Sequence, residues 1–261
     1  MKTRTKLLIT SALILCLSLV FASALKIPGN QMEKDGVPSA VPSIKDKPQS
    51  VFKLEEAKLE NTDTAAWIHI PNTTIDSPVM QSTDNEYYLR RNEKKENDPS
   101  GCFFADYYAT LSNPKLLRQN TVIYGHSTGD EDPTGKHFNQ LFNFKDIEFL
   151  KNNPLIYLTV DDEELIFQIF AVFYTNVNFY YIDPEPFSTD FESFMDAIHR
   201  KNEYNFEEIN ITKQDHILTL STCSRRFNSS SDGRFVVMAK LVETKPTTPI
   251  TIIQNPDPER Q

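Results

Sequence analysis

Eight short runs rich in Ile, Val, Phe, Tyr and Thr constrain the fold of this chain most strongly. Each run is bounded by Pro, Asn, Asp or Gly, which favour turns and end strands. This pattern is typical of a β-barrel or a β-sandwich, so we predict a mainly β fold. The runs are "WIHIP" (67–71), "SPVMQ" (77–81), "GCFFAD" (101–106), "NTVIYGH" (120–126), "LIYLTV" (155–160), "LIFQIFAVFYT" (165–175), "HILTLSTC" (216–223) and "RFVVMAKLVE" (234–243).

Polar, proline-rich segments flank these runs and set the expected boundaries of the folded unit. Residues 27–50 contain Pro, Lys, Asp and Ser without an apolar period, which predicts a flexible stalk. Residues 244–261 have a similar composition and are expected to form a C-terminal tail. A length of 261 residues then leaves one domain, at 51–243.

Two segments inside the folded unit have helical rather than strand-like spacing. The first begins at Phe52 and places Leu54, Ala57 and Leu59 near the same face. The second, "TDFESFMDAIHRKN" (189–202), carries an apolar stripe at helical spacing. We expect this stripe to pack against the strands, so the role of the second helix should be structural.

The N-terminus predicts export. Three basic residues among the first six precede an uncharged, mostly apolar run from Leu7 to Leu25, which is long enough to cross a bilayer as a helix. The basic flank favours a cytoplasmic N-terminus, so residues 1–26 are expected to be a single-pass membrane anchor with the domain outside the cell. "ASA" at 22–24 also resembles a signal-peptidase site, and a cleaved signal is the alternative.

Charge and cysteine content exclude some classes of function. The net charge is −9 with no cluster of Lys and Arg, so we expect no nucleic-acid partner. Outside the apolar run the chain has only Cys102 and Cys223. They predict either one disulfide or one structural and one reactive thiol, and their spacing gives no support for a metal site.

Cys223 occupies the position expected of a reactive thiol. It ends a strand-like run and precedes the polar segment "SRRFNSSSDG", so it should lie at the rim of the sheet. The positive charges of Arg225, Arg226 and Arg234 would stabilise its thiolate. A free cysteine is nevertheless often a small apolar core residue, and position and charge alone do not decide between the two.

A cysteine nucleophile normally needs a histidine. Among the five histidines, His126 has the matching position, because "TVIYGH" also ends a strand-like run. Arg234 begins the strand that follows the Cys223 loop, and a hairpin would bring its guanidinium beside the thiol. Such a fork of donors can stabilise an oxyanion on a substrate carbonyl, although a solvated loop arginine is the ordinary alternative.

The combination "TLSTC", an upstream "IYGH" and a following "RFVV" resembles the sortases, the cysteine transpeptidases of Gram-positive cell surfaces. Further segments, among them "WIHIPNTTIDSPVMQSTDNEYYL" and "HFNQLFNFKDIEFLKNNPLIYL", are similar to class B sortases. The resemblance implies a closed eight-stranded β-barrel with flanking helices and no metal or other cofactor. It also implies that Cys223 is the nucleophile, His126 the acid and base, and Arg234 the oxyanion and substrate clamp.

The resemblance further implies the substrates and a groove that binds them. The partners would be surface proteins with a C-terminal sorting signal, NPQTN-like or PxTG-like, cleaved after Thr, and an amine of a peptidoglycan precursor or cross-bridge. Ser224 is a candidate oxyanion donor through its backbone N–H. The positions that look like groove residues are Asn85, Leu89, Tyr124, Tyr181, Ile182 and Ser221.

Two other functions are open at this point. A pilin polymerase would use the same chemistry with a lysine side chain as the acceptor. A binding module would instead be an exported β-barrel with a structural disulfide between Cys102 and Cys223. Two free thiols in the folded domain would exclude that disulfide.

Overall fold

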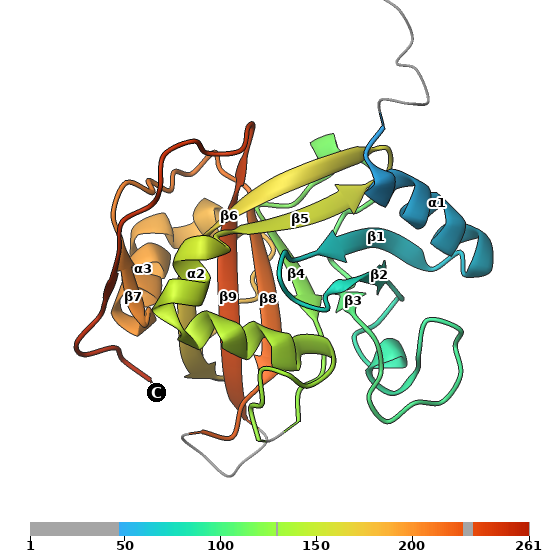
Figure 1. The fold of residues 1–261 in the computed structure, drawn as a ribbon, viewed down its shortest axis with the longest axis horizontal. Helices are drawn as coiled ribbons and strands as arrows, with labels where there is room; N and C mark the ends of the chain where they lie inside the picture. Colours follow the sequence, from blue (N-terminus) through green and yellow to red (C-terminus); the bar gives the residue numbers. More distant parts are fainter. Residues whose placement is uncertain (1–46, 129, 227–231, 261) are drawn as a thin grey trace, which may run out of the picture. The chain divides into compact units, whose positions relative to one another are not determined.

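All eight predicted strand runs contain strands, and these strands close into one barrel (Figure 1). The computed structural model describes residues 47–128, 130–226 and 232–260. The order around the barrel is β1-β2-β3-β4-β8-β9-β6-β5, with β5 pairing back to β1. Their bounds are β1 Thr64–His69, β2 Asp76–Met80, β3 Phe104–Ala105, β4 Asn120–Tyr124, β5 Leu155–Val160, β6 Glu163–Asn176, β8 Ile217–Cys223 and β9 Gly233–Val242.

Two of the barrel's strand pairs are parallel, β2 with β3 and β4 with β8, and the rest are antiparallel. A parallel pair needs a crossover connection. Between β4 and β8 the chain makes the β5–β6 hairpin, several helical segments and a short strand before it returns. This connection brings β8 beside β4 although nearly a hundred residues separate them in sequence.

The barrel is filled by aliphatic and aromatic side chains from every long strand. Ile68, Ile123, Phe167, Leu220 and Val237 are all fully buried in one cluster. Burying a side chain of this size contributes about 1.5–3 kcal/mol. The β-branched and aromatic composition that predicted strands therefore also supplies the core that holds the strand ends in place.

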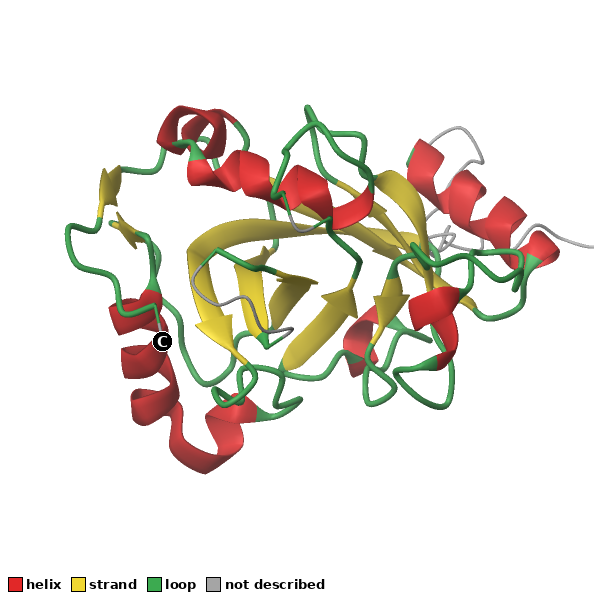
Figure 2. Cartoon of the chain, turned by 90° about the horizontal axis from the view of Figure 1, so that it is seen from below, coloured by secondary structure: helices red, strands yellow, loops and turns green. Residues whose placement is uncertain are grey.

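Helices lie around the outside of the barrel (Figure 2). The α-helices are α1 Gln49–Glu60, α2 Ile147–Asn152 and α3 Pro186–Lys201, and the 3-10 helices are η2 Tyr87–Arg90, η3 Pro114–Leu116 and η4 His137–Lys145. α1 packs on β1 and β5 through Val51 and Leu54, which are fully buried. Phe52 is 40% exposed and Leu59 is 88% exposed, so the face expected to carry Phe52, Leu54, Ala57 and Leu59 is only partly buried.

α3 is longer than predicted and has a kink. Asp190 has non-helical dihedral angles, and its side chain accepts a hydrogen bond from the Ser193 N–H at 3.1 Å. Beyond the kink, Met195 and Ile198 are buried in a second cluster between α3 and the outer face of the barrel. The predicted packing of the apolar stripe against the strands is confirmed.

The C-terminal segment corrects the predicted end of the folded unit at residue 243. β10 (Ile252–Gln254) pairs antiparallel with β7 (Tyr204–Phe206) in a small second sheet. Ile252 joins the main core, and the Arg260 guanidinium binds the Glu203 carboxylate through two hydrogen bonds of 2.7 and 2.8 Å. The proline-rich composition suggested a tail, but Ile250 and Ile252 within it pack on the main core.

In residues 47–128, 130–226 and 232–260 no helix is long and apolar enough to cross a membrane. The predicted anchor at 1–26 and residues 27–46 of the predicted stalk lie outside the described residues.

The attachment of β10 can be tested with two adjacent isoleucines. Ile252 is 4% exposed and Ile253 is 49% exposed. Ile252→Ala should lower the free energy of unfolding by about 2–5 kcal/mol, because it leaves a cavity in the core. Ile253→Ala should change it by less than about 0.5 kcal/mol. Urea denaturation followed by fluorescence measures both, and equal losses would contradict the burial of β10.

Candidate active site

The register between β4 and β8 places His126 beside Cys223. Asn120 pairs with Ile217, and the pairing continues in step to Tyr124 and Ser221. Because the strands are parallel, His126 and Cys223 each lie two residues beyond that last pair, at the same end of the barrel. The Thr222 hydroxyl donates to the Gly125 carbonyl at 2.8 Å, which holds the two strand ends together beyond the last ladder pair.

Arg234 reaches the same place from the other side of Cys223. β8 and β9 are antiparallel, and Cys223 and Arg234 are direct partners across the pair. Directly opposed residues have Cβ atoms about 4.5–5.5 Å apart. The predicted hairpin therefore exists and its register places Arg234 opposite Cys223. The Arg234 guanidinium donates to the Gly233 carbonyl oxygen at 2.9 Å.

The ring of His126 is oriented by a backbone carbonyl. Its Nε2 lies 2.8 Å from the carbonyl oxygen of Leu89 in η2. A carbonyl oxygen only accepts, so Nε2 carries the proton of this hydrogen bond. Nδ1 is then the ring nitrogen left to exchange a proton with a reacting group.

The residue before His126 has to be glycine for a steric reason. A Cβ at Gly125 would lie 2.7 Å from the ring of Phe138 and 2.8 Å from that of Phe103. Both rings are buried, so neither can move aside easily. Gly125 therefore allows the backbone at the end of β4 to pack directly against the Phe103 and Phe138 rings, which positions the next residue, His126.

A pocket of about 280 Å³ opens at this end of the barrel. Cys223, His126 and Arg234 all line it, as do the six predicted groove residues Asn85, Leu89, Tyr124, Tyr181, Ile182 and Ser221. The sequence prediction did not include its other lining residues, which are Phe104, Gly125, Val177, Phe179, Tyr180 and Thr222. Cys223 is exposed, so the thiol is accessible from the pocket.

Hydroxyl groups form part of the pocket wall behind Cys223. The Tyr181 and Ser221 hydroxyls are hydrogen-bonded at 2.8 Å, and both residues are buried. Burial raises the pKa of Tyr181, while the hydrogen bond with Ser221 and the positive charge of Arg234 oppose that shift. Tyr181 therefore presents a neutral phenol, and the arrangement ties the segment after β6 to β8.

Asp106 supports the opposite side of the pocket, and the sequence analysis missed it. Its carboxylate accepts hydrogen bonds from the Tyr124 hydroxyl and from the side-chain amide of Asn85, each at 2.8 Å. Asp106 is 6% exposed. Burial and the charge of Asp106 raise the pKa of Tyr124, so that phenol stays protonated and keeps donating. A buried aspartate after a strand was the available signal, but its partners come from distant segments.

Ser224 is not placed as predicted. Its backbone N–H donates to the Gly233 carbonyl at 3.0 Å, as part of the β8–β9 hairpin. Ser224 is 5% exposed, and its hydroxyl binds the Glu131 carboxylate. Because the hairpin continues one residue past Cys223, this N–H is used within the sheet and does not point into the pocket.

Cys102 is a buried structural thiol, as predicted. It is fully buried and packs with Met80, Tyr88 and Phe104. Burial raises its pKa far above the ordinary value, so it remains a thiol. Both Cys102 and Cys223 are free, which contradicts the disulfide of the binding-module alternative.

The remaining ionisable groups do not form an obvious metal centre. Within the described part of the chain, no group of three or more His, Cys, Asp or Glu side chains is arranged to hold a metal ion. His69 lies near Asp76, with 3.9 Å between Nδ1 and Oδ1, and its side chain is 41% exposed. It is a surface residue away from the pocket.

Comparison with known proteins shows which family has this fold and pocket. The model of the sortase domain matches residues 68–242. Sortase B of Listeria monocytogenes is 36% identical over 191 residues, which cover 73% of this chain and 74% of the relative. Sortase B of Staphylococcus aureus is 29% identical over 192 residues, covering 73% of this chain and 75% of the relative.

Solved structures show the same relationship. A Staphylococcus aureus sortase B–substrate complex superimposes with a TM-score of 0.64 at 28% identity, covering 75% of this chain and 87% of that chain. Sortase B of Bacillus anthracis in complex with AAEK2 gives a TM-score of 0.61 at 34% identity, covering 74% and 84%. The chain therefore belongs to the sortase family and is a cysteine transpeptidase of the sortase B type.

Proposed function

We propose that this enzyme cleaves a C-terminal sorting signal, NPQTN-like or PxTG-like, after Thr and transfers the protein to an amine of the peptidoglycan. One observation carries the proposal: Cys223, His126 and Arg234 line the same rim of one open pocket. The reaction would occur on the outer face of the cell, with the enzyme held by the apolar segment at residues 7–25.

The first half of the reaction forms a thioester. The Cys223 thiolate attacks the Thr carbonyl carbon, and the carbonyl oxygen becomes an oxyanion. When the C–N bond breaks, protonated His126 gives its Nδ1 proton to the leaving amine. The product is a Cys223 thioester and a released C-terminal peptide.

Arg234 supplies positive charge for the oxyanion. It is the direct strand partner of Cys223 and lines the same pocket, which supports a role in binding the carbonyl oxygen beside the thiol. Removing one donor to an oxyanion in other enzymes costs about 100- to 1,000-fold in rate. Since the Ser224 N–H is used in the hairpin, Arg234 is the donor on which this proposal depends.

The second half transfers the acyl group to an amine. His126, now neutral at Nδ1, accepts a proton from the incoming amine as it attacks the thioester, and Cys223 leaves as a thiolate. A thioester conserves much of the reactivity of the cleaved bond, which allows an amine to compete with water. One solved sortase B is in complex with triglycine, a peptide that carries a primary amine, and this supports an amine as the acceptor.

The lining of the pocket supports a substrate that presents both apolar and polar groups, as a peptide does. Aromatic and aliphatic side chains, including Phe104, Val177 and Phe179, line much of it, with polar groups from Asn85 and Tyr124 between them. Ligand-binding pockets are typically mostly apolar with a few placed polar groups that fix the orientation of the ligand. The Asp106 hydrogen bonds fix the orientation of those two polar groups.

Activity measurements on variants of the full chain test the catalytic assignments. Cys223→Ala should abolish cleavage of a fluorogenic NPQTN-type or SPxTG-type peptide, whereas Cys102→Ala should retain most of it. His126→Ala and Arg234→Ala should each lose at least about a hundredfold in kcat/KM. Arg225→Ala is the matched control, because Arg225 is exposed and does not line the pocket. Activity retained in either pocket variant would remove that residue from the mechanism.

Thiol labelling tests the different states of the two cysteines without a substrate. In the native protein at about pH 8, iodoacetamide should modify Cys223 at least about tenfold faster than Cys102, because Cys223 is exposed and Cys102 is buried with a raised pKa. Peptide mass spectrometry locates the label. In urea both should react, and equal native rates would contradict the buried position of Cys102.

A further inference from the structure

A buried carboxylate lies behind the active site and is not part of the reaction described above. Glu131 belongs to the connection between β4 and η4, five residues after His126, and is 9% exposed. Its φ is +54°, in the left-handed region, which costs an ordinary residue about 1–2 kcal/mol. Contacts made by this side chain must offset both the backbone strain and the desolvation of a carboxylate.

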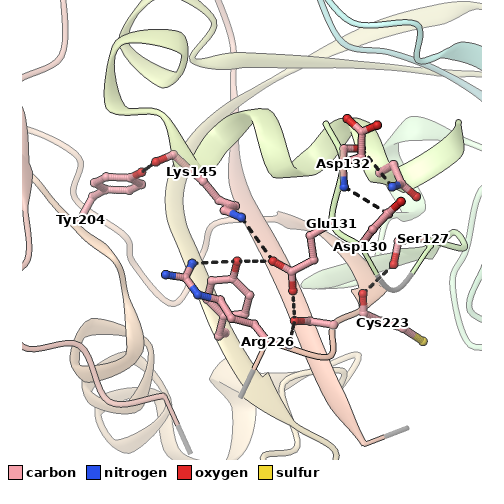
Figure 3. Close-up of polar contacts among 11 residues, drawn as sticks. Ser127, Asp130, Glu131, Asp132, Lys145, Tyr204, Cys223 and Arg226 are labelled. Carbon is pink, nitrogen blue, oxygen red and sulfur yellow. Dashed lines mark hydrogen bonds and ion pairs between the residues drawn. The ribbon is translucent and has the colours of Figure 1, made fainter. Parts of the chain in front are cut away.

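Three donors from three separate segments supply those contacts (Figure 3). The Tyr174 hydroxyl on β6 donates to the carboxylate at 3.0 Å, and the Lys145 ammonium at the end of η4 lies at 3.3 Å. The Ser224 hydroxyl donates to the other carboxylate oxygen. Hydrogen bonds to an ionised, buried carboxylate are stronger than neutral ones, so Glu131 is a cross-link between these segments.

The cross-link extends to the residues that follow Cys223. The Arg226 backbone N–H donates to the Ser224 hydroxyl oxygen at 3.2 Å, and the Arg226 guanidinium donates to the Tyr174 hydroxyl at 3.2 Å. That guanidinium also lies over the Tyr174 ring, 5.1 Å from its centroid. The first residues after Cys223 are thus held on the barrel by the same cluster that holds Glu131.

A second connection joins the same two segments. The Ser127 hydroxyl donates to the Cys223 carbonyl oxygen at 2.6 Å. Ser127 directly follows His126, and Glu131 lies five residues after it. The Ser127–Cys223 and Glu131–Ser224 bonds therefore both link the segment after His126 to the chain around Cys223. In Figure 3 the Cys223 sulfur points away from Glu131, and the carboxylate therefore does not contact the reacting atom.

We propose that Glu131 is a positioning residue that sets the spacing between His126 and Cys223 by holding Ser224. The ladder between β4 and β8 ends at Tyr124 and Ser221. Beyond it, Cys223 and Ser224 pair with β9, and single hydrogen bonds, Glu131–Ser224 among them, tie them to the segment after β4. A displacement of about 1 Å can reduce a rate a hundredfold when proton transfer needs a set geometry. The catalytic consequence rests on the proposed function, whereas the spacing itself does not.

Kinetics test the catalytic consequence. Glu131→Ala should lower kcat for peptide cleavage about 100-fold with KM changed less than about threefold, since the pocket residues that bind the peptide are untouched. Glu131→Gln keeps one acceptor oxygen for Ser224 and should lose only about tenfold. Ser224→Ala should lose as much as Glu131→Ala, and the double variant no more than either, because the two residues act through one bond.

Glu203 provides the matched control. It is also 9% exposed, and its carboxylate is paired with Arg260 away from the pocket. Glu203→Gln should lose stability, measured by thermal unfolding, with kcat unchanged. If Glu203→Gln lowers kcat as much as Glu131→Ala at equal stability, the effect is general loss of structure and the proposal is wrong. An inactive wild-type protein would instead contradict the proposed function.

A measurement of spacing needs no activity. In the variant His126→Cys, the introduced thiol should form a disulfide with Cys223, because neighbouring strands are about 5 Å apart and disulfides need Cα distances of about 4.4–6.8 Å. Equilibration in glutathione buffers gives the effective concentration of the two thiols. Adding Glu131→Ala should lower it about tenfold, while adding Glu203→Gln should leave it unchanged. An effective concentration insensitive to Glu131→Ala would overturn the positioning role.

Discussion

The parallel pairing of β4 with β8 organises the whole active site. Because the two strands are parallel, both run toward the same rim of the barrel. Their register ends at Tyr124 and Ser221, so His126 and Cys223 each lie two residues beyond the last pair. The antiparallel pairing of β8 with β9 then fixes Arg234 beside the thiol. Three neighbouring strands, β4, β8 and β9, thus bring His126, Cys223 and Arg234 to one pocket, although His126 is far from the other two in sequence.

Buried polar clusters refine what the strands establish. Asp106 orients Asn85 and Tyr124 on one side of the pocket, and Glu131 holds the segments behind Cys223. In both, a carboxylate that only accepts hydrogen bonds is surrounded by donors from distant segments. Such clusters are stabilising only when each group is satisfied, so each one selects a single arrangement of the loops that carry the reacting groups.

Positions set by a strand pattern were predictable from the sequence, whereas positions set by hydrogen bonds between distant segments were not. Cys223 and His126 were predictable because both end strand-like runs. The Ser224 N–H was predicted to be an oxyanion donor, but it is paired with the Gly233 carbonyl. Whether this N–H is paired depends on how far the β8–β9 hairpin extends, which composition does not specify. Residues 244–261 were assigned to a tail because Pro and polar residues obscure Ile252, whose partners on β7 and in the core lie far away in sequence.

The order of amino acids was enough to predict the mainly β class, a cysteine at the rim of the sheet and a class B sortase. These follow from local alternation, strand-end positions and short motifs, which are properties of neighbouring residues. Only the folded structure shows that Asp106 and Glu131 support the site and that the Ser224 N–H is paired within the sheet. Burial and the pairing of polar groups depend on what the rest of the fold places around them, so no single segment of the chain encodes them.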